Sequence, residues 1–526
     1  NSADPGFSGK IFITDSTFDL VKVDLILNRA ANTGNLFDTV NIYQQFDEYN
    51  GIVMPVDYRL FVKANVLGLV RFGFELNTIM FNYSINNNIS ENIFDKAIVT
   101  VVPGADNIDS LYWQNTQTIP NTFEEELAYN RIDSVESAPR SFWDDYSVLD
   151  TRINLNDNFS ISAPIAMYHF SRVEGHALDF GVFVDDALNR RFNSSLKMSY
   201  GFSDEKFKQD FNAGYLLGDY RTWEVKFRAF NKLNVLFEES DNYGELLSTL
   251  VTLIAKNEFR DYYYSKGIEV GIDGEVLPVL TMRVNYKNKT DNSAYVNTDY
   301  SFFNKEKTYR TNPPIFETRI NSLNLGFDLD FRDYIEDGFF RRRTSLGRSY
   351  VIFSADVTYS NPDFLSSDLN FTKYELSAFT FIRTFKSAYM NINLYGRMTN
   401  GVTPYQDLYS LPGNIDVVFN SNTFRTLNIN EIIGDKIITL HLTHEFRDEL
   451  FRAMNIPGIK NWEIMISLIF NAALADITSE TASALTFYEI GFGLGQGLLP
   501  FKLELMWKLN YRDGNNFRVG LNLPLL

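Results

Sequence analysis

Four histidines are the side chains of this 526-residue sequence best suited to acid–base or metal chemistry. His441 and His444 stand three residues apart in a stretch with strand-like alternation, so they point to opposite faces and cannot hold one metal ion together. The stretch 441–445 also differs from the helical His-Glu-x-x-His motif of zinc proteases. The other two are His169 and His176. A serine–histidine hydrolase stays open, although no Gly-x-Ser-x-Gly occurs.

A basic run is the second group of interest: Arg341, Arg342 and Arg343 follow two phenylalanines. Guanidinium groups beside aromatic rings suit the headgroup level of a membrane, where they pair with lipid phosphates. The other interpretation is a solvated turn. The glycines at 491, 493 and 495 lack the Lys-Ser/Thr ending of a phosphate loop, and they suit a bend or close packing in a strand.

Composition narrows the function classes. Cysteine is absent, which excludes disulfides, thiolate nucleophiles and cysteine-ligated metals. A formal net charge of −18 argues against nucleic acid as a partner. The longest apolar runs fall far short of the about 20 residues that a membrane helix needs, so a membrane protein of this sequence would be a barrel. The first residues lack signal-peptide features, and we expect any secretion signal to be removed or upstream.

The elements that position charged groups are clearest at the end of the chain. From Phe501 to Tyr511, large apolar residues alternate with polar ones, which gives a ribbon with one apolar and one charged face. Aromatic residues near both ends of the apolar face are typical of a transmembrane barrel strand with lipid outside and water inside. The charged face carries Lys502, Glu504, Lys508 and Arg512.

The same alternation recurs from residue 161 onward and gives about sixteen strands, with an error of about two. In one of them the charged face carries Glu224, Lys226 and Arg228. Short connections alternate with long ones such as 289–318 and 399–435, as in a barrel with tight turns on one rim. We predict an all-β fold, a transmembrane antiparallel β-barrel with a small N-terminal periplasmic β-domain. The competing fold is an array of soluble β-sandwiches.

Three parts follow from this pattern. Residues 1–97 suit a small periplasmic β-sheet domain, residues 98–160 a connector or plug, and residues 161–526 the outer-membrane barrel. A short helix is expected at 122–129 in the connector. Apolar residues between 246 and 254 have helical spacing, so one barrel loop carries an amphipathic helix that rests on the membrane surface or caps the lumen.

Two resemblances concern the N-terminal part and the whole chain. Gly9 to Asp15, with Tyr49, Gly51 and Pro55, is similar to LolA-like periplasmic lipoprotein carriers; the alternative is a generic periplasmic β-domain. The stretches 13–18, 168–175 with 200–204, and 411–446 resemble an uncharacterised outer-membrane family typical of Bacteroidota. In that family a carboxypeptidase-like regulatory domain precedes a periplasmic sheet and a barrel. That domain is missing here, so the resemblance implies a mature or partial version.

The stretch 411–446 is also similar to the surface-antigen barrels of outer-membrane assembly and two-partner secretion factors. In those barrels an arginine lies in a loop that folds back into the lumen, and a Gly-Asp pair precedes the next strand. The matching positions are Arg425, Gly434 and Asp435, and the sequence departs from the pattern at Thr426, where glycine is usual. The other interpretation is an ordinary extracellular loop.

Together these patterns predict an integral outer-membrane β-barrel protein of a Gram-negative bacterium with its N-terminal domain in the periplasm. We expect a non-enzymatic role in transport or envelope assembly, without catalytic residues, cofactor or metal. Expected partners are outer-membrane lipid, lipopolysaccharide, and periplasmic or outer-membrane proteins. Two alternatives stay open: a structural scaffold subunit of a larger outer-membrane complex, and a membrane-embedded lipid hydrolase.

Overall fold

The computed structural model describes residues 6–28, 37–66, 70–85, 87–88, 97–101, 150–345, 347–454, 464–477, 484–496, 501–511, 514 and 516–522, with a few single positions between 111 and 147 and at 499. The helix expected at 122–129 falls largely outside them, as does Arg512. No helix in the described part is long and apolar enough to cross a membrane.

The N-terminal unit is a five-stranded antiparallel sheet in chain order. Its strands are β1 (Phe7–Ile13), β2 (Leu20–Leu27), β3 (Phe37–Tyr49), β4 (Ile52–Val66) and β5 (Val70–Ile79). The register aligns Leu25, Ile42, Leu60 and Leu76 in one row, so one face of the sheet is apolar. Among the described residues that face is shielded only near the end of β4, where Val62 and Ala64 are buried, whereas Leu76 on the edge strand β5 is 48% exposed.

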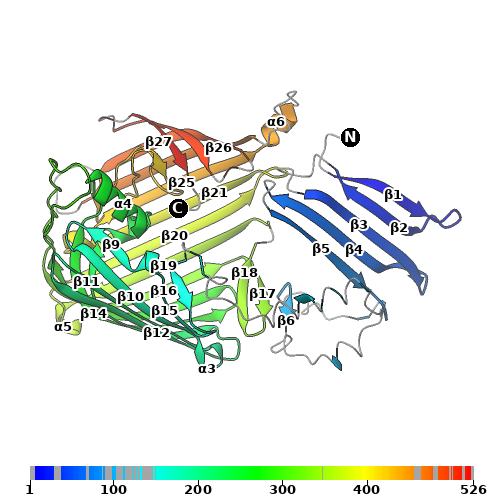
Figure 1. Ribbon diagram of the computed structural model, residues 1–526, viewed down its shortest axis with the longest axis horizontal. Coiled ribbons are helices and arrows are strands. Elements are labelled where there is room, and N and C mark those ends of the chain that lie inside the picture. The colour runs from blue at the N-terminus through cyan, green and yellow to red at the C-terminus, as the bar shows by residue number, and fades with distance from the viewer. Residues whose placement is uncertain are drawn as a thin grey trace.

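The larger unit is a closed barrel (Figure 1). Its long strands are β10 (Gly175–Asp186), β11 (Phe192–Gly201), β12 (Lys206–Leu217), β13 (Trp223–Val235), β14 (Tyr262–Leu277), β15 (Leu280–Ser293), β16 (Thr318–Asp330), β19 (Tyr350–Ser360), β20 (Phe371–Arg383), β21 (Tyr389–Gly401), β25 (Lys436–Arg447), β26 (Ile464–Asp476) and β27 (Leu485–Gln496). Shorter strands complete the wall: β7 (Arg152–Asn154), β8 (Phe159–Ser162), β9 (Tyr168–Ser171), β28 (Lys502–Lys508) and β29 (Phe517–Asn522).

The strand count agrees with the sequence. Fifteen strands from β10 to β29 pair antiparallel in series, with β21 next to β25. Strands β8 and β9 pair with two different stretches of β10. They lie end to end on the same side of β10 and count as one further strand position in the wall. Strand β7 pairs with β8 and adds one more, so the wall has seventeen positions among the described residues. This number lies within the predicted range, and the predicted all-β barrel is confirmed.

The two faces of the wall differ as the alternation predicted. In the last two strands Leu503 is 40%, Trp507 39% and Phe517 46% exposed on the outer side. The residues between them point inward, and Glu504 and Lys508 are 2% and 4% exposed. A sandwich would bury the apolar rows between two layers, so the competing fold is excluded.

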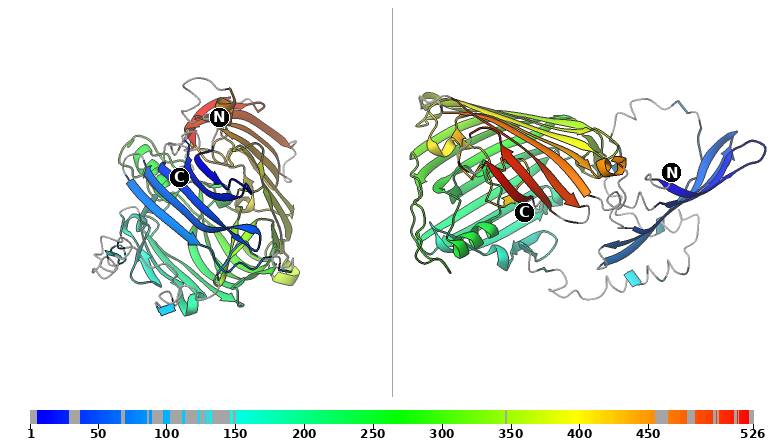
Figure 2. Two further views of the ribbon diagram at one scale, coloured as in Figure 1. Left: turned by 90° about the vertical axis from the view of Figure 1, so that its right-hand side faces the viewer. Right: turned by 90° about the horizontal axis from the view of Figure 1, so that it is seen from above.

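The two rims of the barrel carry different connections. Tight turns at 218–222, 278–279 and 384–388 lie on the rim nearer the N-terminal sheet, and long connections at 236–261, 294–317 and 402–435 lie on the other (Figures 1 and 2). The shorter helical segments are η4 (Pro164–Ala166), α3 (Ala187–Arg190), η5 (Glu238–Ser240), α4 (Glu245–Ala255), α5 (Pro362–Leu365) and α6 (Glu449–Met454).

On the tight-turn rim, the connection between β16 and β19 is a hairpin instead of a short turn. Its strands β17 (Asp333–Asp337) and β18 (Phe340–Thr344) form a small sheet with β6 (Thr100–Val101), which pairs in parallel with β17. This pairing joins the segment that follows the N-terminal sheet to the barrel rim. Strands β7 and β8 begin before residue 161, so the wall extends into the range expected for the connector.

The last strand, β29, also pairs inside the barrel. Its residues Leu521 and Asn522 pair in parallel with the short strand β23 (Val418–Phe419) of the long 402–435 connection. Phe419 is fully buried and packs with Ile469 and Met506. Its ring lies over Gly520, where an added Cβ would stand 2.7 Å from three ring atoms. The ring of Phe419 therefore occupies the space that a side chain at position 520 would fill.

We expect Gly520→Ala to destabilise the barrel by about 1–3 kcal/mol, because the added methyl group forces a buried ring off its position. The measurement is the urea midpoint of unfolding, followed by the heat-modifiable gel mobility of the purified protein. Gly396→Ala is the matched control, since its Cβ would meet nothing closer than 3.8 Å. Equal midpoints for the two variants would contradict the packing described.

Candidate functional site: the luminal segment and its anchors

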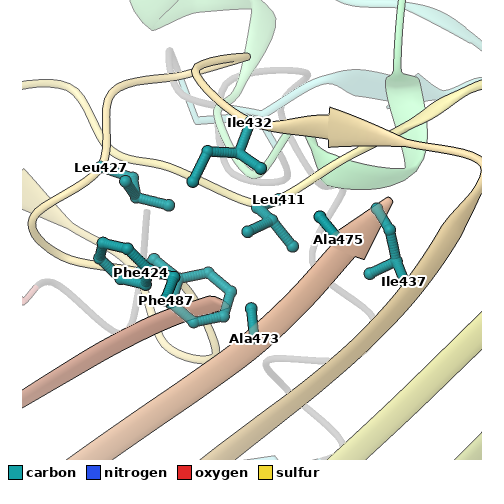
Figure 3. Packing of buried hydrophobic residues seen from close by; sticks show 8 residues of the cluster. All are labelled: Leu411, Phe424, Leu427, Ile432, Ile437, Ala473, Ala475 and Phe487. Carbon is teal, nitrogen blue, oxygen red and sulfur yellow. The ribbon is translucent and has the colours of Figure 1, made fainter. Parts of the chain in front are cut away.

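The connection between β21 and β25, residues 402–435, folds back into the barrel; we name it the luminal segment. It contains η6 (Tyr405–Asp407), β22 (Tyr409–Ser410), β23 and β24 (Ile433–Gly434). Its apolar side chains Leu411, Phe424, Leu427 and Ile432 pack against inward residues of β25, β26 and β27 (Figure 3). Those wall residues are Ile437, Ala473, Ala475 and Phe487. Burial of this face places the segment in the lumen.

Arg425 forms the central ion pair of the segment. Its Nε donates to Glu504 Oε2 on β28 at 2.9 Å, and both side chains are at least 96% buried. Asn522 Nδ2 donates to the other carboxylate oxygen of Glu504 at 2.7 Å. Both oxygens of the buried carboxylate are therefore used, which is the condition for a buried charge to be tolerated.

Glu489 on β27 is the second anchor and is fully buried. Its Oε1 accepts from the backbone N–H of Arg425 at 2.8 Å and from Asn471 Nδ2 at 2.6 Å. Its Oε2 accepts from the backbone N–H and the Oγ1 of Thr426 at 2.9 and 2.6 Å. One carboxylate thus fixes two consecutive residues of the luminal segment through charge-assisted hydrogen bonds.

Arg518 on β29 closes the same site from the last strand. Its Nη1 donates to the carbonyl oxygen of Leu427 at 3.1 Å, and its Nη2 donates to Asn428 Oδ1 at 2.5 Å. Strands β27, β28 and β29 therefore each contribute at least one buried charged side chain to the segment. We call Arg425, Thr426, Glu489, Glu504 and Arg518 the latch.

Tyr243 joins the luminal segment to the loop before α4. Its hydroxyl accepts from the backbone N–H of Ile415 at 2.8 Å and donates to the carbonyl oxygen of Val418 at 2.9 Å. Burial raises the pKa of Tyr243 to about 12, so the phenol keeps the proton that it donates. Asn420 Nδ2 donates to the carbonyl oxygen of Asn242 at 2.8 Å in the same contact.

Two cavities remain in the lumen, with volumes of about 360 and 380 Å³, and Arg228, Glu269 and Asn285 line both. The first is bounded by the luminal segment from Thr403 to Ser410. Its charged walls are largely paired: Lys289 lies 2.8 Å from Asp291, and Arg397 Nη1 lies 2.8 Å from Glu239. The luminal segment thus forms one wall of a polar chamber inside the barrel.

The other charges predicted to face the lumen lie in ion pairs along the wall. Lys226 bridges Glu224 at 3.2 Å and Asp273 at 2.5 Å, Arg228 contacts Asp210 at 2.6 Å, and Lys502 contacts Glu445 at 2.5 Å. Lys508 is buried, with its ammonium group 5.2 Å from the ring centre of Tyr511. Arg512 lies outside the described residues.

Gly434 and Asp435 are placed apart from the latch, where the luminal segment enters β25. The backbone N–H of Asp435 donates to the carbonyl oxygen of Asp476 at 3.0 Å, and a Cβ at position 434 would stand 2.7 Å from that oxygen. Gly434 therefore lets the segment approach β26 closely. This role is structural and distinct from that of Arg425.

The basic run lies on the hairpin at the tight-turn rim. Arg341 bonds to Glu275 and Glu336, and Arg343 bonds to the carbonyl oxygens of Pro278 and Arg332. Arg342 is the exposed member, with 70% of its side chain accessible and Asp337 at 2.9 Å. All three guanidinium groups therefore contact protein atoms, and a role of the run at a lipid headgroup stays a prediction.

The histidines take part in hydrogen bonds with groups other than serine in the described residues. His169 bridges Glu174 at 2.7 Å and Asp179 at 2.5 Å. His176 bonds to Tyr168 at 2.8 Å, His441 to Asn471 at 3.0 Å, and His444 to Thr384 at 2.9 Å. The contacts found for these imidazoles hold strands and loops together.

Residues 145–494 match the C-terminal domain of a family of unknown function, DUF5686, and residues 1–83 match the domain of the same name that precedes it. No curated protein matches the chain. Among solved structures, BamA from Haemophilus ducreyi lacking POTRA domains 1–3 aligns with 12% identity and a TM-score of 0.39, over 92% of this chain and 88% of that one.

CdiB from Acinetobacter baumannii aligns with 11% identity and a TM-score of 0.37, over 66% of this chain and 56% of that one. CdiB from Escherichia coli aligns with 12% identity and a TM-score of 0.36, over 66% and 59%. The alignment thus spans less than two thirds of either CdiB chain. The barrel itself is established by the strand pairings above.

We expect Glu489→Gln to weaken the attachment of the luminal segment by about 2–3 kcal/mol, because hydrogen bonds to a charged acceptor are lost and an amide N–H₂ then faces donors. Hydrogen exchange of the amides of residues 423–427 measures the effect and should accelerate. Glu269→Gln, which removes a carboxylate from the cavity wall, should leave these amides protected. Unchanged exchange in Glu489→Gln would contradict the role of the carboxylate.

Proposed function

The chain belongs to the DUF5686 family of unknown function, and from this premise we propose that it is an integral outer-membrane β-barrel protein with a non-enzymatic role in transport or envelope assembly. The observation that carries the proposal is the combination of an apolar outer wall with a segment that the latch holds inside the lumen. A barrel of this kind passes material only when the segment moves.

The apolar outer wall supports the membrane location. Large side chains such as Leu503, Trp507 and Phe517 are about two-fifths or more exposed on the outer side of consecutive strands. Each would forgo about 1.5–3 kcal/mol of transfer free energy by facing water, whereas hydrocarbon accommodates them without cost. All backbone groups of a closed antiparallel wall are paired between strands, which is the arrangement that lipid requires.

The connection lengths support the orientation. In bacterial outer-membrane barrels, tight turns face the periplasm and long loops face outward. The N-terminal sheet lies beyond the tight-turn rim, which puts it in the periplasm under this proposal (Figure 1). Its apolar face, with Phe72, Phe74 and Leu76 about half exposed, suits contact with a periplasmic protein or a lipid. Outer-membrane lipid and lipopolysaccharide are the expected surroundings of the barrel.

A scaffold subunit of a larger outer-membrane complex is the second candidate, and the latch is the observation that favours it. A luminal segment held by three strands closes the lumen permanently if nothing releases it. Conductance separates the two roles, because a transport barrel opens when the latch is weakened and a scaffold stays closed.

The membrane location predicts that the full chain leaves the membrane fraction only in detergent. Its mobility on a gel should also differ between unheated and boiled samples, because a closed barrel resists unfolding by the gel detergent. A chain recovered in the aqueous fraction without detergent would contradict the proposal.

For the transport role we expect the full chain to show a low basal conductance in planar bilayers and Arg425→Ala to raise it. Truncation of Arg425 leaves Glu504 buried without its cation, which costs about 3–5 kcal/mol and favours release of the segment. Lys226→Gln is the control, because it removes a wall cation that contacts no part of the segment. If Arg425→Ala folds and stays at the basal conductance, the scaffold role is favoured instead.

A further inference from the structure

Helix α4 presents its apolar residues to the outside and its polar residues to the protein. Leu246, Leu250 and Ile254 lie four residues apart on one face and are 50%, 44% and 47% exposed. The buried residues are Ser248, Thr249, Thr252 and Leu253, of which three are polar. A surface helix of a soluble protein has the opposite arrangement.

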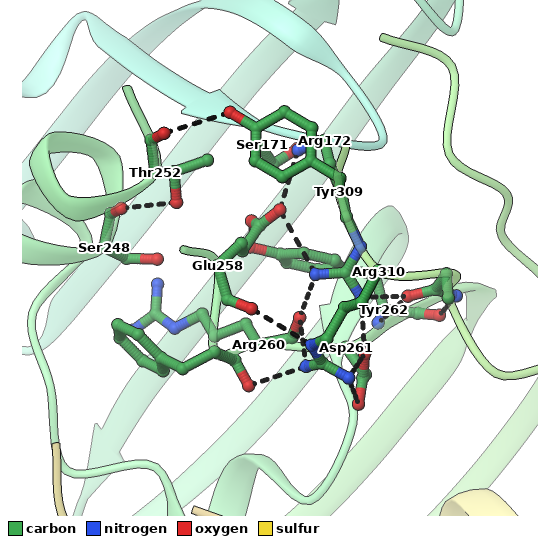
Figure 4. A network of polar contacts seen from close by, with 12 residues as sticks. Ser171, Arg172, Ser248, Thr252, Glu258, Arg260, Asp261, Tyr262, Tyr309 and Arg310 are labelled. Atoms are coloured by element: carbon green, nitrogen blue, oxygen red, sulfur yellow. Dashed lines mark hydrogen bonds and ion pairs between the residues drawn. The ribbon is translucent and has the colours of Figure 1, made fainter. Parts of the chain in front are cut away.

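The polar face is held by specific hydrogen bonds. Thr249 Oγ1 accepts from the backbone N–H of Phe170 at 3.2 Å, and the carbonyl oxygen of Thr252 accepts from the hydroxyl of Tyr309 at 3.0 Å. Below the helix, Arg172 donates to Glu258 through both its backbone N–H and its Nη1 (Figure 4). The orientation of α4 is therefore fixed by the barrel, and the apolar stripe is turned outward by these contacts.

The helix lies beside β9, and its residue Leu253 packs against an outward-facing side chain of that strand. Phe170 of β9 pairs directly with His176 of β10, so both side chains lie on one face of the sheet. Along β10 that face continues to Leu178 and Phe180, which are 53% and 40% exposed. The opposite face carries Asp179, whose carboxylate contacts His169. Phe170, which packs against Leu253 of α4, is thus on the lipid side of the barrel.

Aromatic rings connect this wall to the surface around the helix. The ring centroid of His176 lies 5.2 Å from that of Phe170 and 4.9 Å from that of Tyr300, and the Tyr300 centroid lies 5.9 Å from that of Phe302. Phe302 and Phe303 are 52% and 62% exposed, and the backbone N–H of Phe302 donates to the carbonyl oxygen of Leu253. The stripe of α4 and the outer wall therefore form one continuous apolar surface.

We propose that α4, together with Phe302 and Phe303, lies in the outer leaflet of the membrane as an interfacial anchor at the long-loop rim. This inference rests on the membrane location proposed above. An interfacial helix places its apolar face against acyl chains and keeps charged groups at headgroup level. Lys305 and Lys307 lie two and four residues after Phe303, with Glu306 between them, and all three are exposed. The two ammonium groups suit anionic headgroups at the border of the surface.

The absence of native cysteine permits a direct test on the full chain with one introduced label at a time. Leu250→Cys, labelled with an environment-sensitive fluorophore, is reconstituted into phosphatidylcholine–phosphatidylglycerol vesicles with plain or brominated acyl chains. We expect bromine to remove as much of its fluorescence as it removes from a label at Leu178→Cys in the barrel wall. Aqueous iodide should quench the label at Glu245→Cys, at the exposed start of the helix, more than the label at position 250.

The outcomes separate this inference from the proposed function. Quenching at position 250 by iodide and not by bromine would mean that the stripe lies in water. Protection from both quenchers would mean that protein, such as a second copy, covers it. Either result overturns the lipid anchor, while bromine quenching of the label at Leu178→Cys still shows that the barrel is in the membrane. Loss of bromine quenching at Leu178→Cys itself would instead overturn the membrane location.

Discussion

The buried carboxylate of Glu489 is the interaction on which the inner structure depends. A charge with no exposed surface is tolerated only when donors surround it, and here all four hydrogen bonds to it are made inside the barrel. Three of the donors belong to the luminal segment, so the segment cannot leave without exposing or stranding the charge. The same rule explains why Glu504 is shared between Arg425 and Asn522. The luminal segment is therefore held in place by buried charges as well as by its apolar contacts with the wall.

The alternation of side chains along the strands made most of the barrel predictable. A period of two fixes which residues share a face, and the aromatic content of the apolar face distinguishes lipid from a second sheet. The strand number followed from counting such stretches. The pattern could not give the pairing between β29 and the luminal strand β23, about a hundred residues away in sequence. Pairing partners at such distances are set by tertiary contacts.

The latch was predictable only in part. Arg425 and Glu504 were both singled out, but from separate stretches, and nothing in the sequence joined them. Glu489 was missed although it stands on the inward face of an alternating strand, since one inward carboxylate looks like any other luminal charge.

Thr426 shows how a single side chain can add to the site. Its hydroxyl donates a hydrogen bond to Glu489 that a glycine at this position could not make. Which face of α4 is buried was likewise decided by its Ser and Thr contacts, not by its period.

The luminal segment and helix α4 are connected through the loop that precedes the helix. The loop that begins α4 holds the luminal segment through Tyr243 and Asn242, and Arg260, just after the helix, donates to Asp241 and to the carbonyl oxygen of Tyr243. Since α4 is bonded to β9 through Thr249, a displacement of the segment must break these bonds or displace the helix. An apolar surface held in lipid would resist that pull. The position of the luminal segment is therefore coupled to the contact between the long-loop rim and whatever covers α4.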